Sequence, residues 1–202
     1  MQNIPIHIAV EDPLSEAVVR KLLSTSSVNY HIGSCFGKTG FGYLKSKING
    51  FNKAAQGNPF FVLTDLDTSF NCAPELVTNW ITGVKHPNLI FRVAVKEVET
   101  WLLADKKTFS TFLKINQNLI PQNVEAVIDP KQTVIELAKK SPNRDLREDI
   151  VPPERSTRKQ GPNYNNRMIG YVNDNWNILH AIKNSQSLLR AYQKIESFNP
   201  TW

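Results

Sequence analysis

Short apolar runs alternate with helical patterns over the first half of the chain. The apolar runs predict four strands, at Ile4–Val10, Ser27–Gly33, Pro59–Asp65 and Asn88–Lys96. Apolar residues at helical spacing predict helices at Ser15–Ser24, Tyr43–Ala55, Ala73–Val84 and Glu97–Asp105, with residues 106–113 continuing or restarting the last one. Because strands and helices alternate, and because the strands are apolar throughout, we expect an α/β fold with a mostly parallel sheet flanked by helices.

The strand patterns end near residue 113. Asp129–Lys140 predicts a short helix, Ser141–Arg167 a long polar loop, and Met168–Ile195 one or two closing helices. Loops of that length are often functional or disordered. The pattern therefore predicts an α/β core over residues 1–113. A helical extension over residues 114–202 would pack on the same domain and carry a basic loop at about 141–167.

Charge is unevenly distributed along the 202 residues, which carry a formal net charge of +6. Residues 1–110 hold 11 Lys and Arg against 9 Asp and Glu, whereas residues 131–202 hold 12 against 7. A basic surface favours polyanions such as nucleic acid, and a solvated charged surface is the structural alternative.

Other features of the composition bear on location. No apolar run is long enough to cross a membrane, and the first residues lack the basic and apolar regions of a secretory signal. Cys35 and Cys72 belong to no metal-binding motif, which argues against a zinc site and a disulfide framework. We expect a cytoplasmic protein.

Acidic residues follow three of the predicted strands. They form three pairs, Glu11 with Asp12, Asp65 with Asp67, and Glu97 with Glu99. Ligand chemistry in open parallel sheets gathers at the carboxyl ends of the strands, so these carboxylates could meet at one edge. Carboxylates held close together repel, and Mg²⁺ or Mn²⁺ with its preference for oxygen ligands would remove the conflict. Two such ions could clamp the attacking and leaving oxygens of a phosphodiester.

Each acidic position also has a structural interpretation. Asp12 and Ser15 could be turn and capping residues, and Glu97 could favour a helix start through the helix dipole. Glu16 could be a solvated helical residue. The metal hypothesis depends on the three strand ends acting together.

The order of these segments resembles the Toprim fold. A strand with Glu11 precedes a helix, a later strand ends in Asp65-Leu66-Asp67, and "KEVETWLLAD" (Lys96–Asp105) places Glu97 and Glu99 at a helix start. Topoisomerases, primases and nucleases of the OLD (overcoming lysogenisation defect) family share that fold. The chain is most similar to small stand-alone Toprim-like proteins of uncharacterised function, which carry a phrase similar to "EVETWLLAD". "DPKQTVIELAKK" and "NSQSLLRAYQKI" also resemble segments of that group.

The resemblance implies a metal site for phosphodiester chemistry. Glu11 would be a metal ligand or general base, Asp65 and Asp67 the metal-binding pair, and Glu99, with Glu97 second, the later acidic position. Glu16 would match a second helical glutamate of OLD-type nucleases, although "EDPLSE" is one residue longer than the usual spacing and Asp12 stands where glycine is common. The resemblance also implies a phage-defence or mobile-element context.

Two basic segments could contact phosphate. "GSCFGKT" (Gly33–Thr39) lacks one of the four residues that a P-loop requires between its first Gly and Gly-Lys-Thr, so a flexible basic loop with Lys38 as a point charge is the preferred interpretation. "RSTRKQGPNYNNR" (Arg155–Arg167) could grip a backbone and stack a base on Tyr164, or be a solvated loop. Lys159 is a candidate transition-state cation.

Three functions remain open at this stage. The first is a Mg²⁺- or Mn²⁺-dependent nuclease with Glu11, Asp65, Asp67, Glu99 and Lys159 in its catalytic site. The second is a non-catalytic Toprim module that binds nucleic acid or a separate ATPase subunit. The third is a phosphatase or phosphotransferase for small molecules. The residues leave open DNA or RNA, one metal or two, and whether the chain forms an oligomer.

Overall fold

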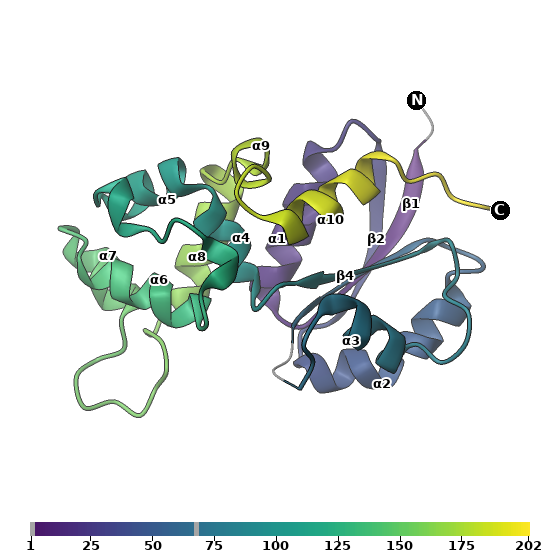
Figure 1. Cartoon of the computed structure of the whole chain (residues 1–202), viewed down its shortest axis with the longest axis horizontal. Coiled ribbons are helices and arrows are strands. Elements are labelled where there is room, and N and C mark those ends of the chain that lie inside the picture. The colour runs from purple at the N-terminus through teal and green to yellow at the C-terminus, as the bar shows by residue number, and fades with distance from the viewer. Residues whose placement is uncertain (1–2, 67–68) are drawn as a thin grey trace. The chain divides into compact units, whose positions relative to one another are not determined.

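The computed structural model describes residues 3–66 and 69–202 of the chain (Figure 1). The chain divides into two compact units: residues 1–95 with 187–202 form unit 1, and residues 96–186 form unit 2. The change of pattern that the sequence places at 113/114 differs from this division, because the chain leaves unit 1 directly after the last strand and returns to it for the final segment.

Unit 1 is an α/β unit built on a four-stranded, all-parallel sheet, which confirms the predicted fold class. The strands lie in the order β2-β1-β3-β4, a Rossmann-like arrangement. Their bounds are β1 Ile4–Val10, β2 Tyr30–Gly37, β3 Phe60–Asp65 and β4 Leu89–Ala94. Chain order reverses between β1 and β3, because β2 lies on one side of β1 and β3 on the other. In open α/β sheets, such a switch point is where ligands bind.

Helices cover both faces of the sheet. α2 (Phe41–Ala54) and α3 (Ala73–Trp80) lie on one face, and α1 (Pro13–Thr25) and α10 (Gln186–Glu196) lie on the other (Figure 1). Alternate strand residues enter the core below α2 and α3, among them Phe60 and Val62 of β3. On the opposite face Leu188, Ala191 and Ile195 of α10 are fully buried. Burial on both faces explains the mostly apolar sequences of β1, β3 and β4.

Several boundaries in unit 1 differ from the sequence prediction. β2 begins at Tyr30 rather than Ser27 and runs on to Gly37. α1 begins at Pro13, because the carboxylate of Asp12 accepts a hydrogen bond from the Ser15 backbone N–H at 2.8 Å and caps the helix. Ser15 is therefore inside the helix, where it is buried.

Unit 2 consists of short helices. They are α4 Val98–Ala104, α5 Lys106–Leu113, η1 Gln117–Leu119, η2 Val124–Ala126, α6 Pro130–Lys139, α7 Arg144–Ile150, α8 Tyr164–Asp174 and α9 Ile178–Ala181. The predicted loop at 141–167 is wrong at both ends, because α7 and the first turn of α8 lie within it. α7 escapes pattern recognition since its few buried residues, such as Leu146 and Ile150, stand among charges. None of the helices formed by the described residues is long and apolar enough to cross a membrane.

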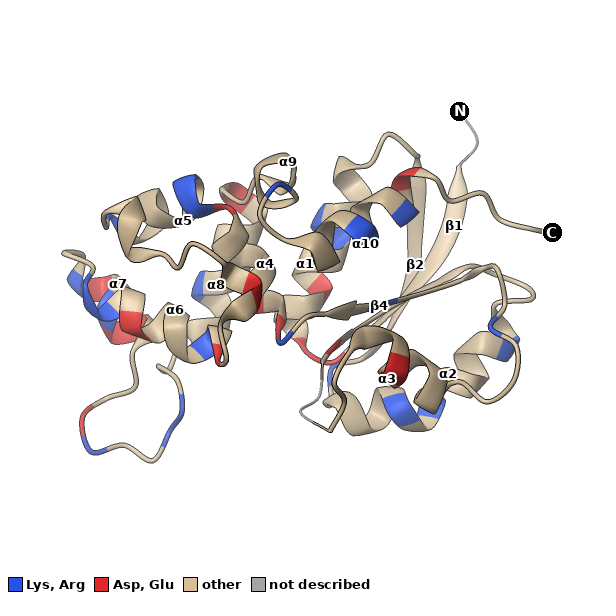
Figure 2. Cartoon of the chain, viewed as in Figure 1, with Lys and Arg blue, Asp and Glu red and all other residues tan. Residues whose placement is uncertain are grey.

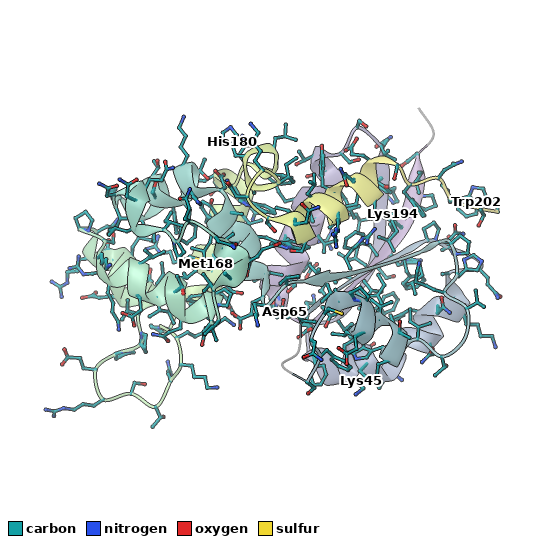
Figure 3. All side chains as sticks on the ribbon, viewed as in Figure 1. Lys45, Asp65, Met168, His180, Lys194 and Trp202 are labelled. Carbon is teal, nitrogen blue, oxygen red and sulfur yellow. The ribbon has the colours of Figure 1, made fainter. Side chains whose placement is uncertain are left out.

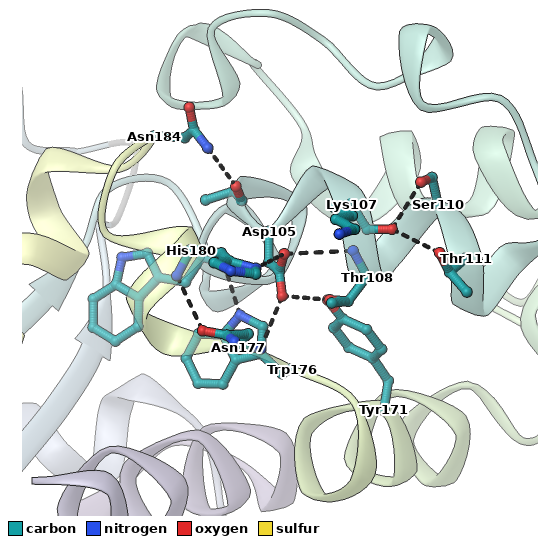
Figure 4. A network of polar contacts seen from close by, with 12 residues as sticks. Asp105, Lys107, Thr108, Ser110, Thr111, Tyr171, Trp176, Asn177, His180 and Asn184 are labelled. Atoms are coloured by element: carbon teal, nitrogen blue, oxygen red, sulfur yellow. Dashed lines mark hydrogen bonds and ion pairs between the residues drawn. The ribbon is translucent and has the colours of Figure 1, made fainter.

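A buried aspartate organises unit 2 (Figure 4). Asp105 is 1% exposed, caps α5 through the Thr108 backbone N–H, and accepts hydrogen bonds from the Thr108 hydroxyl and, at 2.8 Å, from the Asn177 backbone N–H. The Tyr171 and Thr108 hydroxyls lie 2.8 Å apart. One carboxylate thus joins α5 to the segment between α8 and α9, and it explains why α5 restarts at Lys106 instead of continuing α4.

Candidate functional site

The carboxyl edge of the sheet brings Glu11 to the end of β3. Glu11 directly follows β1, and its Oε1 atom accepts a hydrogen bond from the backbone N–H of Asp65 at 3.0 Å and another from the Thr64 hydroxyl. Thr64 is buried, whereas Glu11 and Asp65 are partly exposed. Asp65, labelled in Figure 3, is the last residue of β3. The two acids therefore share the switch point between β1 and β3.

The segment after β2 holds the backbone of Glu11 in place. The Lys38 N–H donates to the Val10 carbonyl and the Gly40 N–H donates to the Glu11 carbonyl, both at 2.9 Å. Gly37 has a φ of +95°, and a Cβ atom there would stand 2.1 Å from the Val10 oxygen. Only glycine allows this approach. The close contact joins the end of β2 to the residue directly before Glu11.

The donors at this edge suit a hard divalent cation. Mg²⁺ takes oxygen ligands, usually keeps several waters, and is commonly held by one or two carboxylates together with substrate phosphates. Glu11 and Asp65 supply two such carboxylates. Asp67, the third predicted ligand, lies outside the described residues. Among residues 3–66 and 69–202, no three His, Cys, Asp or Glu side chains form a metal-binding group. The described part of the site therefore offers a pair of carboxylates.

Glu16 has two cationic partners. Its carboxylate lies 2.8 Å from Arg20 and 3.1 Å from Lys38. Burial alone would raise the pKa of Glu16, but hydrogen bonds from Arg20 and Lys38 outweigh it and hold that pKa below its usual value. Burial and the nearby Glu16 raise the pKa of the Cys35 thiol to about 11, so Cys35 stays protonated at neutral pH. The Glu16 carboxylate therefore balances the positive charges of Arg20 on its own helix and of Lys38 just after β2.

The apparent P-loop is not a phosphate loop. Gly33, Ser34, Cys35 and Phe36 belong to β2 and do not form a turn: Cys35 and Phe36 pair with β1, and the pairing is interrupted at Gly33 and Ser34. Lys38 follows this strand at a φ of +68° and forms an ion pair with Glu16. The segment predicted as a flexible loop is therefore the end of an edge strand followed by a tight turn.

Glu97 and Glu99 belong to unit 2, and both have partners there. Glu97 precedes α4, and its carboxylate accepts the Lys131 backbone N–H at 2.9 Å. Glu99 is 2% exposed, accepts a hydrogen bond from the Tyr164 hydroxyl at 3.1 Å, and lies 3.6 Å from the Lys131 ammonium. Lys131 therefore supplies the positive charge that a buried carboxylate needs.

The basic loop also belongs to unit 2. Lys159 is exposed within residues 151–163, between α7 and α8. Tyr164 is fully buried and bonded to Glu99, so the prediction that it could stack a base is wrong. The tyrosine starts α8 instead of belonging to the loop, and its apolar ring is covered while its hydroxyl has a partner.

A polar hollow of about 420 Å³ lies beside Asp105 in unit 2. Its lining includes three lysines and a histidine, namely Lys106, Lys107, Lys183 and His180. Asp105 already accepts the hydrogen bonds that cap α5. The hollow therefore presents several basic groups around the buried Asp105.

Sequence reasoning missed two residues that position the candidate acids. Thr64 holds Glu11, and Lys131 neutralises Glu99. The signal for Thr64 was a hydroxyl directly before the Asp-x-Asp segment at the end of an otherwise apolar strand. Lys131 carried no such signal, because it stands 32 residues from Glu99 and meets it only through the packing of α6 against α4.

Comparison of the chain with protein-family models, with curated proteins and with solved structures gives no match. The likeness to Toprim proteins therefore stays a prediction made from the residues.

Proposed function

We propose that the chain is a Mg²⁺- or Mn²⁺-dependent hydrolase of nucleic-acid phosphodiesters, with Glu11 and Asp65 as metal-holding carboxylates. The observation that carries this proposal is the hydrogen bond of 3.0 Å from the Asp65 N–H to the Glu11 carboxylate, since it brings acids 54 residues apart to one switch point. The Toprim resemblance adds the reaction class. Asp67 would be a third ligand, two residues beyond Asp65.

The protein's own groups would orient this site. Thr64 and the Asp65 N–H hold one oxygen of Glu11 in place, so that carboxylate is preorganised. A bound divalent cation would neutralise phosphodiester charge and lower the pKa of a water molecule. Lys38, whose ammonium is 3.1 Å from Glu16, would add a point charge near the end of β2.

The test is metal-dependent cleavage of plasmid and single-stranded DNA and RNA. We expect cleavage with Mg²⁺ or Mn²⁺ and none with EDTA. Glu11→Gln and Asp65→Asn should each lower the rate by about 100-fold or more, because each removes a ligand charge at nearly constant shape. Glu16→Gln tests the predicted second helical glutamate, and Glu75→Gln, at an exposed acid of α3, is the matched control. Equal activity of Glu11→Gln and wild type would refute the proposal.

A non-catalytic nucleic-acid-binding module is the second candidate, and the ion pair of Glu99 with Lys131 favours it. A carboxylate already neutralised by a lysine has less need of a metal. The part of Glu97 and Glu99 in metal binding stays a prediction, which Glu99→Gln tests in the same cleavage assay. Lys159→Met tests the predicted transition-state cation. Metal-independent binding without cleavage would select this second function.

A further inference from the structure

Four basic side chains of unit 1, in the segment before β4, on β4 and on α10, lie within electrostatic range of their neighbours in this set. Lys85 lies just before β4, Arg92 is in its middle, and Arg190 and Lys194 stand one helical turn apart on α10. Basic residues along α10 are visible in Figure 2, and Figure 3 labels Lys194. We call these four residues the cationic edge. They share no residue with the acidic pair Glu11 and Asp65.

Arg92 is the most constrained member of the cationic edge. Its side chain is partly buried on an apolar strand, and its Nε atom is buried with no hydrogen-bond partner among the described residues. Buried polar atoms normally have a partner. Burial and the neighbouring Arg190 lower the pKa of the Arg92 guanidinium, which nevertheless stays charged because arginine does not deprotonate in proteins. The chain thus holds a charged donor in an unfavourable place.

Lys85 meets the same surroundings. Its ammonium donates to the Leu89 carbonyl at 2.8 Å, which holds it against the start of β4. Burial, Lys194 and Arg92 together lower its pKa. The like charges therefore lie close enough to destabilise one another.

No carboxylate compensates the cationic edge within the described residues. The ion pairs that the described residues form do not include Lys85, Arg92, Arg190 or Lys194. The acid on α10, Glu196, is hydrogen-bonded to the N–H and hydroxyl of Ser27. A solvated charged surface would not need a partly buried arginine. Several cations that lack a carboxylate partner, beside a buried donor, are what an anion-binding surface requires.

We propose that the cationic edge binds consecutive phosphates of a nucleic-acid strand. The cations are spread over the segment before β4, the strand itself and two turns of α10, as contacts to a chain of phosphates would be. The proposal rests on the proposed function for the identity of the polymer. It goes further by placing the nucleic-acid strand on β4 and α10, and not on the loop at 151–163.

The test is the binding of a fluorescein-labelled single-stranded oligonucleotide of about 20 nucleotides, followed by fluorescence anisotropy in EDTA so that no cleavage occurs. The variant is Arg190→Gln/Lys194→Gln. Its matched control is Lys45→Gln/Lys47→Gln, which removes the same charge from the exposed side of α2. We expect the first variant to bind about tenfold more weakly or worse, and its salt slope to shrink by about 1.4, while the control changes less than about twofold.

Two outcomes would overturn the inference. Equal weakening by both double variants would show general electrostatics in place of a defined surface. Displacement of the oligonucleotide by inorganic phosphate, much beyond that by chloride at equal ionic strength, would point to a site for a small phosphate ligand. Neither outcome depends on catalysis. Conversely, tight binding without any metal-dependent cleavage would sink the proposed hydrolase and leave the cationic edge in place.

Discussion

Gly37 offers a sharp test of how the fold positions Glu11. In Gly37→Ala, the new Cβ atom would meet the Val10 oxygen at 2.1 Å at a φ of +95°. The two groups must separate by about 1 Å before the repulsion fades. That movement breaks the hydrogen bond of 2.9 Å from the Lys38 N–H to the same oxygen. Glu11 is the next residue along the chain.

The magnitude follows from the separate costs. The left-handed backbone costs a residue with a Cβ about 1–2 kcal/mol, the lost hydrogen bond about 1 kcal/mol, and the steric conflict about 1–3 kcal/mol. We expect Gly37→Ala to lower the free energy of unfolding by about 3–6 kcal/mol. Two other glycines separate the cost of the backbone conformation from the cost of the steric conflict. Gly40 has a φ of +89° and open space around it, and Gly42 has open space without the unusual φ.

The assay is urea unfolding followed by circular dichroism. Amide hydrogen exchange over β1 and β2 accompanies it, because two units can open separately. Gly40→Ala should cost about 1–2 kcal/mol from backbone strain alone. Gly42→Ala, near the start of α2, should be neutral or stabilise by up to about 1 kcal/mol. A Gly37→Ala variant no less stable than Gly40→Ala would refute the claim that the Val10 contact holds the segment after β2.

Three further changes test other parts of the molecule. Lys131→Met should destabilise unit 2 by about 3 kcal/mol in urea unfolding, because it leaves the buried Glu99 carboxylate without its cation. Adding Glu99→Gln to the same chain should restore part of the lost stability, because no buried charge then lacks a partner. Additive losses from the two substitutions would contradict this. Glu16 has a folded pKa below its ordinary 4.5, so its contribution is present above that pH and is lost as pH falls through the folded pKa. Glu16→Gln should therefore reduce the loss of unfolding free energy at acid pH by less than about 1 kcal/mol. An unchanged dependence of the unfolding free energy on pH would show that these ion pairs do not stabilise the fold. Asp105→Ala should cost about 3 kcal/mol because the Asn177 N–H and the α5 cap lose their acceptor, and Asp105→Asn, which keeps an acceptor, should cost clearly less in the same measurement.

The apolar patterns predicted the sheet well where a strand is covered on both faces. β1 ends in the apolar run Ile8–Val10 and β3 begins with the apolar run Phe60–Leu63, and their predicted positions match to within a residue. β2 is an edge strand with several exposed residues, such as Gly33 and Ser34, so its sequence lacks that pattern and its start was misplaced.

The site divides in the same way. The meeting of Glu11 with Asp65 could be expected, since parallel strands bring their carboxyl ends together. The pairing of Glu16 with Lys38 and of Glu99 with Lys131 could not, because these ion pairs depend on how a turn and a distant helix pack. Periodicity carries no information on such contacts.

The order of the two units along the chain has a consequence for biosynthesis. The ribosome completes β1 to β4 before it makes residues 96–186, and α10 follows only after them. At about 5–20 residues per second, the nascent sheet waits roughly 5 to 18 seconds for Leu188, Ala191 and Ile195 to cover one of its faces. During that interval apolar β-strand surface is open to chaperones and to neighbouring nascent chains. Codons over residues 96–186 that slow translation should therefore increase misassembly, even though they leave the protein sequence unchanged.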